Sequence, residues 1–138
     1  MDLEMAKAES RAMSNPHKGH TGLRRMVHAA RHSIDGLAAA LRSESAFRQE
    51  CLGAAIMLPL AFWVGQSWVE TVLLMATVML VLIVELLNSG IEAAIDRVSL
   101  ELHDLSKFAK DLASAAVFLS ILLCAGVWAT ALFQRFIP

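Results

Sequence analysis

The uncharged segment Leu112–Phe133 constrains the fold of this chain most. It has 22 residues without a charged side chain, and about 20 apolar residues suffice for an α-helix to cross a bilayer. Cys51–Val69 and Thr71–Val84 are two further uncharged blocks, and the helix of the latter is expected to continue past two glutamates. Three transmembrane helices are therefore predicted, at about 46–66, 71–97 and 109–134.

The composition favours an all-α membrane protein of one domain. Of the 138 residues, 57% are hydrophobic, against about 45–50% in soluble domains. This excess argues against a disordered chain, a disulfide scaffold and a nucleic-acid-binding domain. Cys51 and Cys124 both lie in apolar sequence, so we expect two free, buried thiols.

Lysine and arginine are distributed unevenly around the three blocks. Of the twelve, eight precede the first block, none lies between the first and second, three lie between the second and third, and one, Arg135, follows the third. Because basic residues gather in cytoplasmic loops, we expect a cytoplasmic N-terminus and an external C-terminus. Trp63, Trp68 and Trp128 fall towards the outer ends of the spans, where interfacial aromatic side chains are expected.

An amphipathic helix is predicted before the first span, at about 22–42. Apolar residues recur there at spacings of three and four, between Leu23 and Leu41, and basic residues occupy the other faces. Such a helix beside a membrane span lies in the interface. Residues 1–20 are polar and without periodicity, which predicts a disordered tail, not a signal peptide, before a single membrane domain of residues 21–138.

The second block carries the polar residues that indicate chemistry. At about 100° per residue, one stripe of this helix holds Glu85, Asn88, Ser89, Glu92 and Asp96. A single asparagine or serine in a span usually only joins helices. Ionisable groups within a membrane are costly and mark functional sites, so two glutamates on one face favour a functional stripe that faces protein or water.

Depth distinguishes the two glutamates. Counted from Thr71 at about 1.5 Å per residue, Glu85 lies about 21 Å and Glu92 about 31 Å along the helix, and the hydrocarbon core is about 30 Å thick. Glu85 can therefore reach a lipid near its headgroup, and Glu92 a soluble, metal-bound phosphate. Four more polar residues are expected at this cytoplasmic depth: Glu44, Arg48, Lys110 and Ser114.

These residue types suit phosphoryl transfer. The reaction needs carboxylates for Mg²⁺, a base for the attacking hydroxyl and cations for the phosphate charge. The sequence has neither a P-loop nor a glycine-rich kinase loop, so a kinase would be of another type. A proton- or cation-conducting subunit is an alternative, but the outer half of the second span has only Thr71 and Thr77 as polar residues. His28 and His32 are spaced as a metal pair, although solvated or headgroup-contacting histidines are favoured there.

Three stretches of the chain resemble the prokaryotic diacylglycerol kinase family: ESAFRQE at 44–50, VELLNSGIEAAIDR at 84–97 and AKDLASAA at 109–116. The resemblance covers roughly Thr21–Phe133. It implies a surface helix with three transmembrane helices, and a homotrimer whose active sites are shared between subunits. It also implies ATP-dependent phosphorylation of diacylglycerol to phosphatidic acid with Mg²⁺, in the bacterial inner membrane with a periplasmic C-terminus.

The resemblance also implies roles for single residues. Glu85 is the general base, and Glu44 and Glu92 hold Mg²⁺. The implied nucleotide-binding residues are Arg25, His32, Glu44, Asn88, Glu92, Glu101, His103, Lys110 and Asp111. The implied lipid-substrate residues are Arg25, Ser33, Phe47, Arg48, Gln49, Glu85 and Ser114.

Some positions depart from the family. His32, Ile34 and Ala38 stand where some relatives have other residues, which weakens the assignments on the surface helix. A related branch phosphorylates undecaprenol with the same catalytic residues, so a polyprenol kinase is the alternative function. The Phe47–Glu50 segment resembles the diacylglycerol branch more closely.

Overall fold

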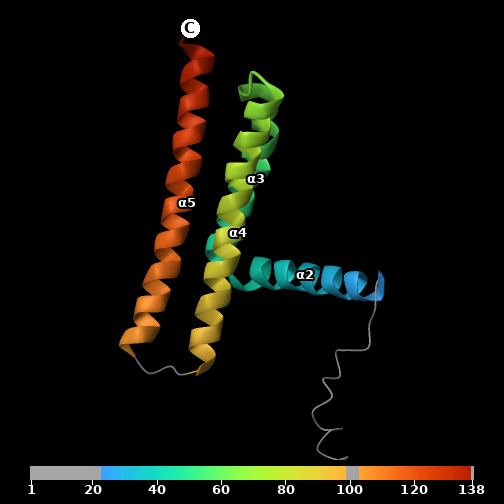
Figure 1. The fold of residues 1–138 in the computed structure, drawn as a ribbon, viewed down its shortest axis with the longest axis vertical. Helices are drawn as coiled ribbons and strands as arrows, with labels where there is room; N and C mark the ends of the chain where they lie inside the picture. The colour runs from blue at the N-terminus through green and yellow to red at the C-terminus, as the bar shows by residue number, and fades with distance from the viewer. Residues whose placement is uncertain (1–22, 99–102, 138) are drawn as a thin grey trace, which may run out of the picture. The chain divides into compact units, whose positions relative to one another are not determined.

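The computed structural model describes residues 23–98 and 103–137, and this part of the chain is helical apart from short connections (Figure 1). The predicted all-helical class is confirmed. The predicted tail, 1–20, and Glu101 lie outside the described residues. Contacts divide the chain after Ala38 into two units, which are described separately. The helices are α2 (Leu23–Ser43), α3 (Ser45–Val64), α4 (Trp68–Val98) and α5 (Asp104–Phe136).

The first unit contains most of α2, which is amphipathic as its periodicity predicts. Its apolar side chains are not buried: Met26 is 70% exposed and Ile34 65%. An apolar stripe left uncovered opposite a basic face is typical of a helix that lies in a membrane interface.

The second unit is built around α4, which packs against both α3 and α5. Figure 1 shows α4 and α5 running side by side along most of their length. Small side chains permit this close packing, as in other membrane helices. The core contains Ala54, Ala61, Val64, Leu74, Val78, Cys124, Trp128 and Ala131. Cys124 is buried and Cys51 half-buried, and both are free thiols.

Two of these helices are long and apolar enough to cross a membrane, namely Trp68–Arg97 within α4 and Asp104–Phe136. Only 28% and 22% of their most apolar windows are buried, unlike the core helix of a soluble protein. The third predicted span is not confirmed. The uncharged run of α3 extends only from Cys51 to the end of the helix at Val64. This run is shorter than the about 20 apolar residues that usually span a bilayer.

The connection between α3 and α4 is set by a capping-box sequence, Ser67-x-x-Glu70. The Ser67 hydroxyl accepts a hydrogen bond from the Glu70 N–H at 3.2 Å, and the Glu70 carboxylate accepts one from the Gln66 N–H at 2.8 Å. The next α4 residue facing the turn, Thr71, is buried and donates from its hydroxyl to the Ser67 carbonyl at 3.0 Å. The first of these bonds satisfies the Glu70 N–H, one of the donors that the start of a helix leaves unpaired.

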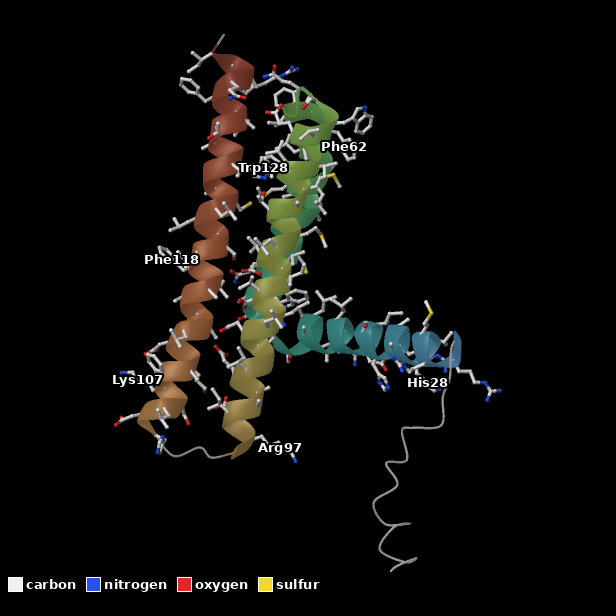
Figure 2. The ribbon with its side chains drawn as sticks, in the orientation of Figure 1. His28, Phe62, Arg97, Lys107, Phe118 and Trp128 are labelled. Atoms are coloured by element: carbon white, nitrogen blue, oxygen red, sulfur yellow. The ribbon has the colours of Figure 1, made fainter. Side chains whose placement is uncertain are left out.

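The three tryptophans have different surroundings. Trp68 is 78% exposed, as expected for an interfacial residue, and Trp63 lies beside Phe136 and the Arg135 guanidinium. Trp128 differs from the expectation, because it is buried and its Nε1 donates to the Leu74 carbonyl at 3.3 Å. Figure 2 shows Trp128 between α5 and α4. This indole fixes the contact between the two helices because its N–H requires a partner when buried.

The close approach of Gly65 to Thr71 gives a stability test. A Cβ at position 65 would overlap the Thr71 hydroxyl and crowd the Thr71 Cα. We therefore expect Gly65→Ala to lower the free energy of unfolding by about 1–3 kcal/mol, measured as a lower thermal midpoint in detergent. Gly36→Ala is the control, since nothing lies within 4 Å of a Cβ there, and an equal midpoint for both variants would contradict the expectation.

Candidate active site

Four glutamates of the second unit form the most unusual feature of the described chain. Glu85 is only 5% exposed, in the middle of the apolar helix α4. Its carboxylate interacts electrostatically with those of Glu92 and Glu44, and also with that of Glu50. None of the four has a basic ion-pair partner among the described residues. We call Glu44, Glu50, Glu85 and Glu92 the carboxylate cluster.

Glu44 enters the cluster from the break between α2 and α3. It is the residue before the first turn of α3, with extended backbone angles of φ −98° and ψ 114°. Its side chain is half-buried and accepts a hydrogen bond from the Ser43 hydroxyl at 3.2 Å. Glu44 therefore lies where α3 begins, without a side-chain hydrogen bond to the first turn of that helix.

Asn88 and Glu92 are one turn apart on α4 and interact directly. The Asn88 Nδ2 donates to the Glu92 Oε1 at 3.3 Å, the spacing at which helical side chains meet. Two buried oxygens have no hydrogen-bond partner among the described residues, Asn88 Oδ1 and Glu50 Oε2. Buried acceptors normally have a partner, so both atoms suit a site completed by a ligand or water.

The carboxylate cluster is not a preformed cage for a metal ion. Within residues 23–98 and 103–137, no three His, Cys, Asp or Glu side chains converge closely enough to hold an ion. Mg²⁺ in kinases is held by one or two carboxylates together with substrate phosphates and water. The carboxylates of Glu44 and Glu92, which have no ion-pair partner among the described residues, fit that kind of site.

Lys110 lies at the cytoplasmic side of the predicted topology and is paired with an acid. Its ammonium lies 2.5 Å from the Asp96 Oδ1, joining α5 to α4. Asp111 and Ser114 are exposed on α5. His103 begins α5, because its Nδ1 accepts a hydrogen bond from the Leu105 N–H at 3.2 Å. This cap explains why α5 begins at Asp104, earlier than the predicted 109.

The predicted lipid-contacting residues at the start of α3 have three different surroundings. Phe47 is 2% exposed and packs inside the protein, whereas Gln49 is exposed. The Arg48 Nη1 donates to the Arg42 carbonyl at 3.0 Å and to the Leu41 carbonyl at 3.4 Å. Arg48 therefore caps the last turn of α2 instead of pairing with Glu44, which lies four positions before it.

The predicted residues on α2 belong to the other unit. Arg25, His32 and Ser33 are exposed there, and the Ser33 hydroxyl donates to the Ala29 carbonyl at 3.0 Å. Their assignments to nucleotide and lipid stay predictions, as does that of Glu101, which lies outside the described residues.

Glu50 was not predicted as a site residue, although it belongs to the carboxylate cluster. It also lines a cavity of about 240 Å³ between α3, α4 and α5, whose other lining residues are apolar or small and include Met57, Val78 and Cys124. The sequence does contain a signal for it. Glu50 adjoins the uncharged block Cys51–Val69, with no basic residue three or four positions away to pair with it on a helix.

Comparison with known proteins identifies the family. The sequence model described as prokaryotic diacylglycerol kinase matches residues 31–132. The chain belongs to the prokaryotic diacylglycerol kinase family. This agrees with the resemblance carried by residues 44–50, 84–97 and 109–116. The match includes every member of the carboxylate cluster and Lys110.

Individual relatives are similar over nearly their whole length. The chain is 50% identical to a diacylglycerol kinase of Pseudomonas aeruginosa over 118 residues, which cover 86% of this chain and 96% of the relative. It is 42% identical to that of Haemophilus influenzae over 82% and 96% of the two chains. It is 44% identical to that of Escherichia coli over 84% and 95%. Together with the two long apolar helices, the family indicates a membrane protein.

Proposed function

We propose that this protein transfers the terminal phosphoryl group of ATP to the hydroxyl of diacylglycerol, giving phosphatidic acid and ADP. The observation that carries the proposal is Glu85, a carboxylate buried in the apolar helix α4 beside three other glutamates. A base at that place is within reach of a lipid headgroup but surrounded by side chains that exclude bulk water. The relatives' shared name, diacylglycerol kinase, supports the same activity.

In this mechanism Glu85 is the general base. Its carboxylate accepts the proton of the lipid hydroxyl while the hydroxyl oxygen forms its bond to the γ-phosphorus. The bond between that phosphorus and the β–γ bridging oxygen breaks, and ADP leaves. Apolar neighbours of Glu85 on α4, such as Leu82 and Leu86, keep water from competing as the acceptor.

The nucleotide is bound on the cytoplasmic side of Glu85. Glu44 and Glu92 would hold Mg²⁺, which when bound would supply the positive charge that neutralises the phosphates. Asn88 orients the Glu92 carboxylate through their hydrogen bond. Lys110 donates to phosphate oxygens, and His103 and Asp111, at the start of α5, contact the nucleotide near them.

The same proposal includes a homotrimer and three membrane spans, of which α3 would cross with its full 20 residues, Arg48 and Glu50 lying in its first turns. The apolar side chains exposed on α3, α4 and α5 include Leu52, Ile56, Leu87, Phe118 and Leu119, so this unit needs lipid or further copies of itself to cover them. Arg97 and Lys107 lie at the same end of α4 and α5 (Figure 2). Because basic residues favour the cytoplasm, this end is cytoplasmic, with the N-terminus, in the bacterial inner membrane.

The lipid kinase activity is tested with the protein purified in detergent. With Mg²⁺ and γ-labelled ATP, we expect label in phosphatidic acid when diacylglycerol is offered. Undecaprenol is offered in a separate reaction, and preferential labelling of that lipid would assign the chain to polyprenol kinases. Label in neither lipid would refute the proposed function.

The role of Glu85 is tested by Glu85→Gln, which removes the base but keeps the side chain's size. We expect kcat to fall by about 10²–10⁴-fold, the usual contribution of a general base, while MgATP binding persists. Glu70→Gln, at the other end of α4, is the matched control. A Glu85→Gln variant with near-normal kcat would show that another group accepts the proton.

Glu92 is expected to act on the nucleotide side. Glu92→Gln removes one of the two proposed Mg²⁺ ligands, so binding of MgATP is expected to weaken by at least about tenfold, since even the outer partners of metal ligands contribute that much. The measurement is the stabilisation of the folded protein by MgATP, seen as a thermal shift. A thermal shift equal to that of the unmodified protein would show that Glu92 is not a Mg²⁺ ligand.

A further inference from the structure

Asp96 is a residue of the α4 stripe to which neither the resemblance nor the proposed function gives a role. It lies one turn beyond Glu92 on the same face of α4. Its Oδ1 is 2.5 Å from the Lys110 Nζ, an interaction that connects α4 with α5 across 14 positions of sequence. The pair is therefore a tertiary contact next to the proposed nucleotide site.

A contribution to folding stability is a weak explanation for this ion pair. The Lys110 and Asp96 side chains are 36% and 51% exposed, and exposed ion pairs contribute little to folding because water and salt screen them. The packing of α4 against α5 is already provided by the core around Leu74 and Trp128. The ion pair therefore matters mainly because it fixes the direction of the Lys110 side chain.

Lysine needs such a partner more than other cations do. Its ammonium is carried on a flexible four-carbon chain, and a free lysine loses much side-chain entropy when it binds a phosphate. The ammonium has three donors, so one hydrogen bond to Asp96 leaves two for phosphate oxygens. Lys107, one turn earlier on α5, is exposed and forms no ion pair within the described part of the chain.

We infer that Asp96 is a positioning residue, which holds the Lys110 ammonium one turn from Glu92 so that it meets the phosphates of the bound nucleotide. Asp96 acts through Lys110 and does not itself contact the nucleotide. The inference rests on the proposed function, because it takes Lys110 as a phosphate contact. It also excludes the opposite role, in which the Asp96 carboxylate competes with phosphate for the lysine and weakens nucleotide binding.

The test is a double-mutant cycle of Asp96→Ala and Lys110→Ala in the full-length protein. For Asp96→Ala we expect the KM for MgATP to rise about tenfold, and kcat/KM to fall with it, while the KM for diacylglycerol stays unchanged, as expected for coupled residues in contact. In the Lys110→Ala background the same substitution is expected to cause no further loss. Lys107→Ala and Asp104→Asn are the controls, expected to retain the activity of the unmodified protein.

Three results would overturn the inference. The first is an unchanged KM for MgATP in Asp96→Ala, and the second is a lowered KM for MgATP in that variant. The third is a double variant in which the losses of the two single variants are additive. Asp96→Asn, which keeps the side chain's size, replaces Asp96→Ala if that variant does not fold. Binding of a non-hydrolysable ATP analogue is measured on the same proteins without lipid, and an unweakened affinity in Asp96→Ala also overturns the inference. An unmodified protein that labels no lipid refutes the proposed function instead, while the binding cycle still decides the role of Asp96.

Discussion

A carboxylate on a transmembrane helix needs protein or water in place of its lost hydration, and much of this structure follows from that requirement at Glu85. Glu85 is buried, so α4 has to turn the face that carries it towards the beginning of α3. The same face carries Asn88 and Glu92, linked by a hydrogen bond. A rotation of α4 that exposed Glu85 to lipid would separate all three from Glu44.

The carboxylate cluster brings like charges together without a balancing cation among the described residues. Four glutamates interact without a basic partner, an arrangement that costs free energy in the absence of a ligand. Buried like charges of this kind are common at functional sites. Lys110, on α5, is paired with Asp96, at the edge of the stripe and outside the cluster.

Most of the secondary structure and the polar stripe of α4 were predictable, because they depend on local periodicity. The helices differ from their predicted ranges mainly at the ends, where His103 and Ser67 provide caps. The surroundings of Phe47, Arg48 and Trp128 were not predictable. Each depends on which residue a neighbouring helix presents, and hydropathy alone does not separate a buried aromatic side chain from an interfacial one.

Local sequence patterns were enough to predict a helical chain with long apolar segments, and to place Glu85, Glu92 and Asp96 on one face of α4. The reason is that helix geometry relates residues three and four positions apart without any partner. Three contacts became apparent only in the folded chain: Glu50 interacts with Glu85, Asp96 pairs with Lys110, and the Trp128 indole donates to the Leu74 carbonyl. These contacts connect different helices, and their relative rotation and register follow from side-chain packing between helices, which no local pattern encodes.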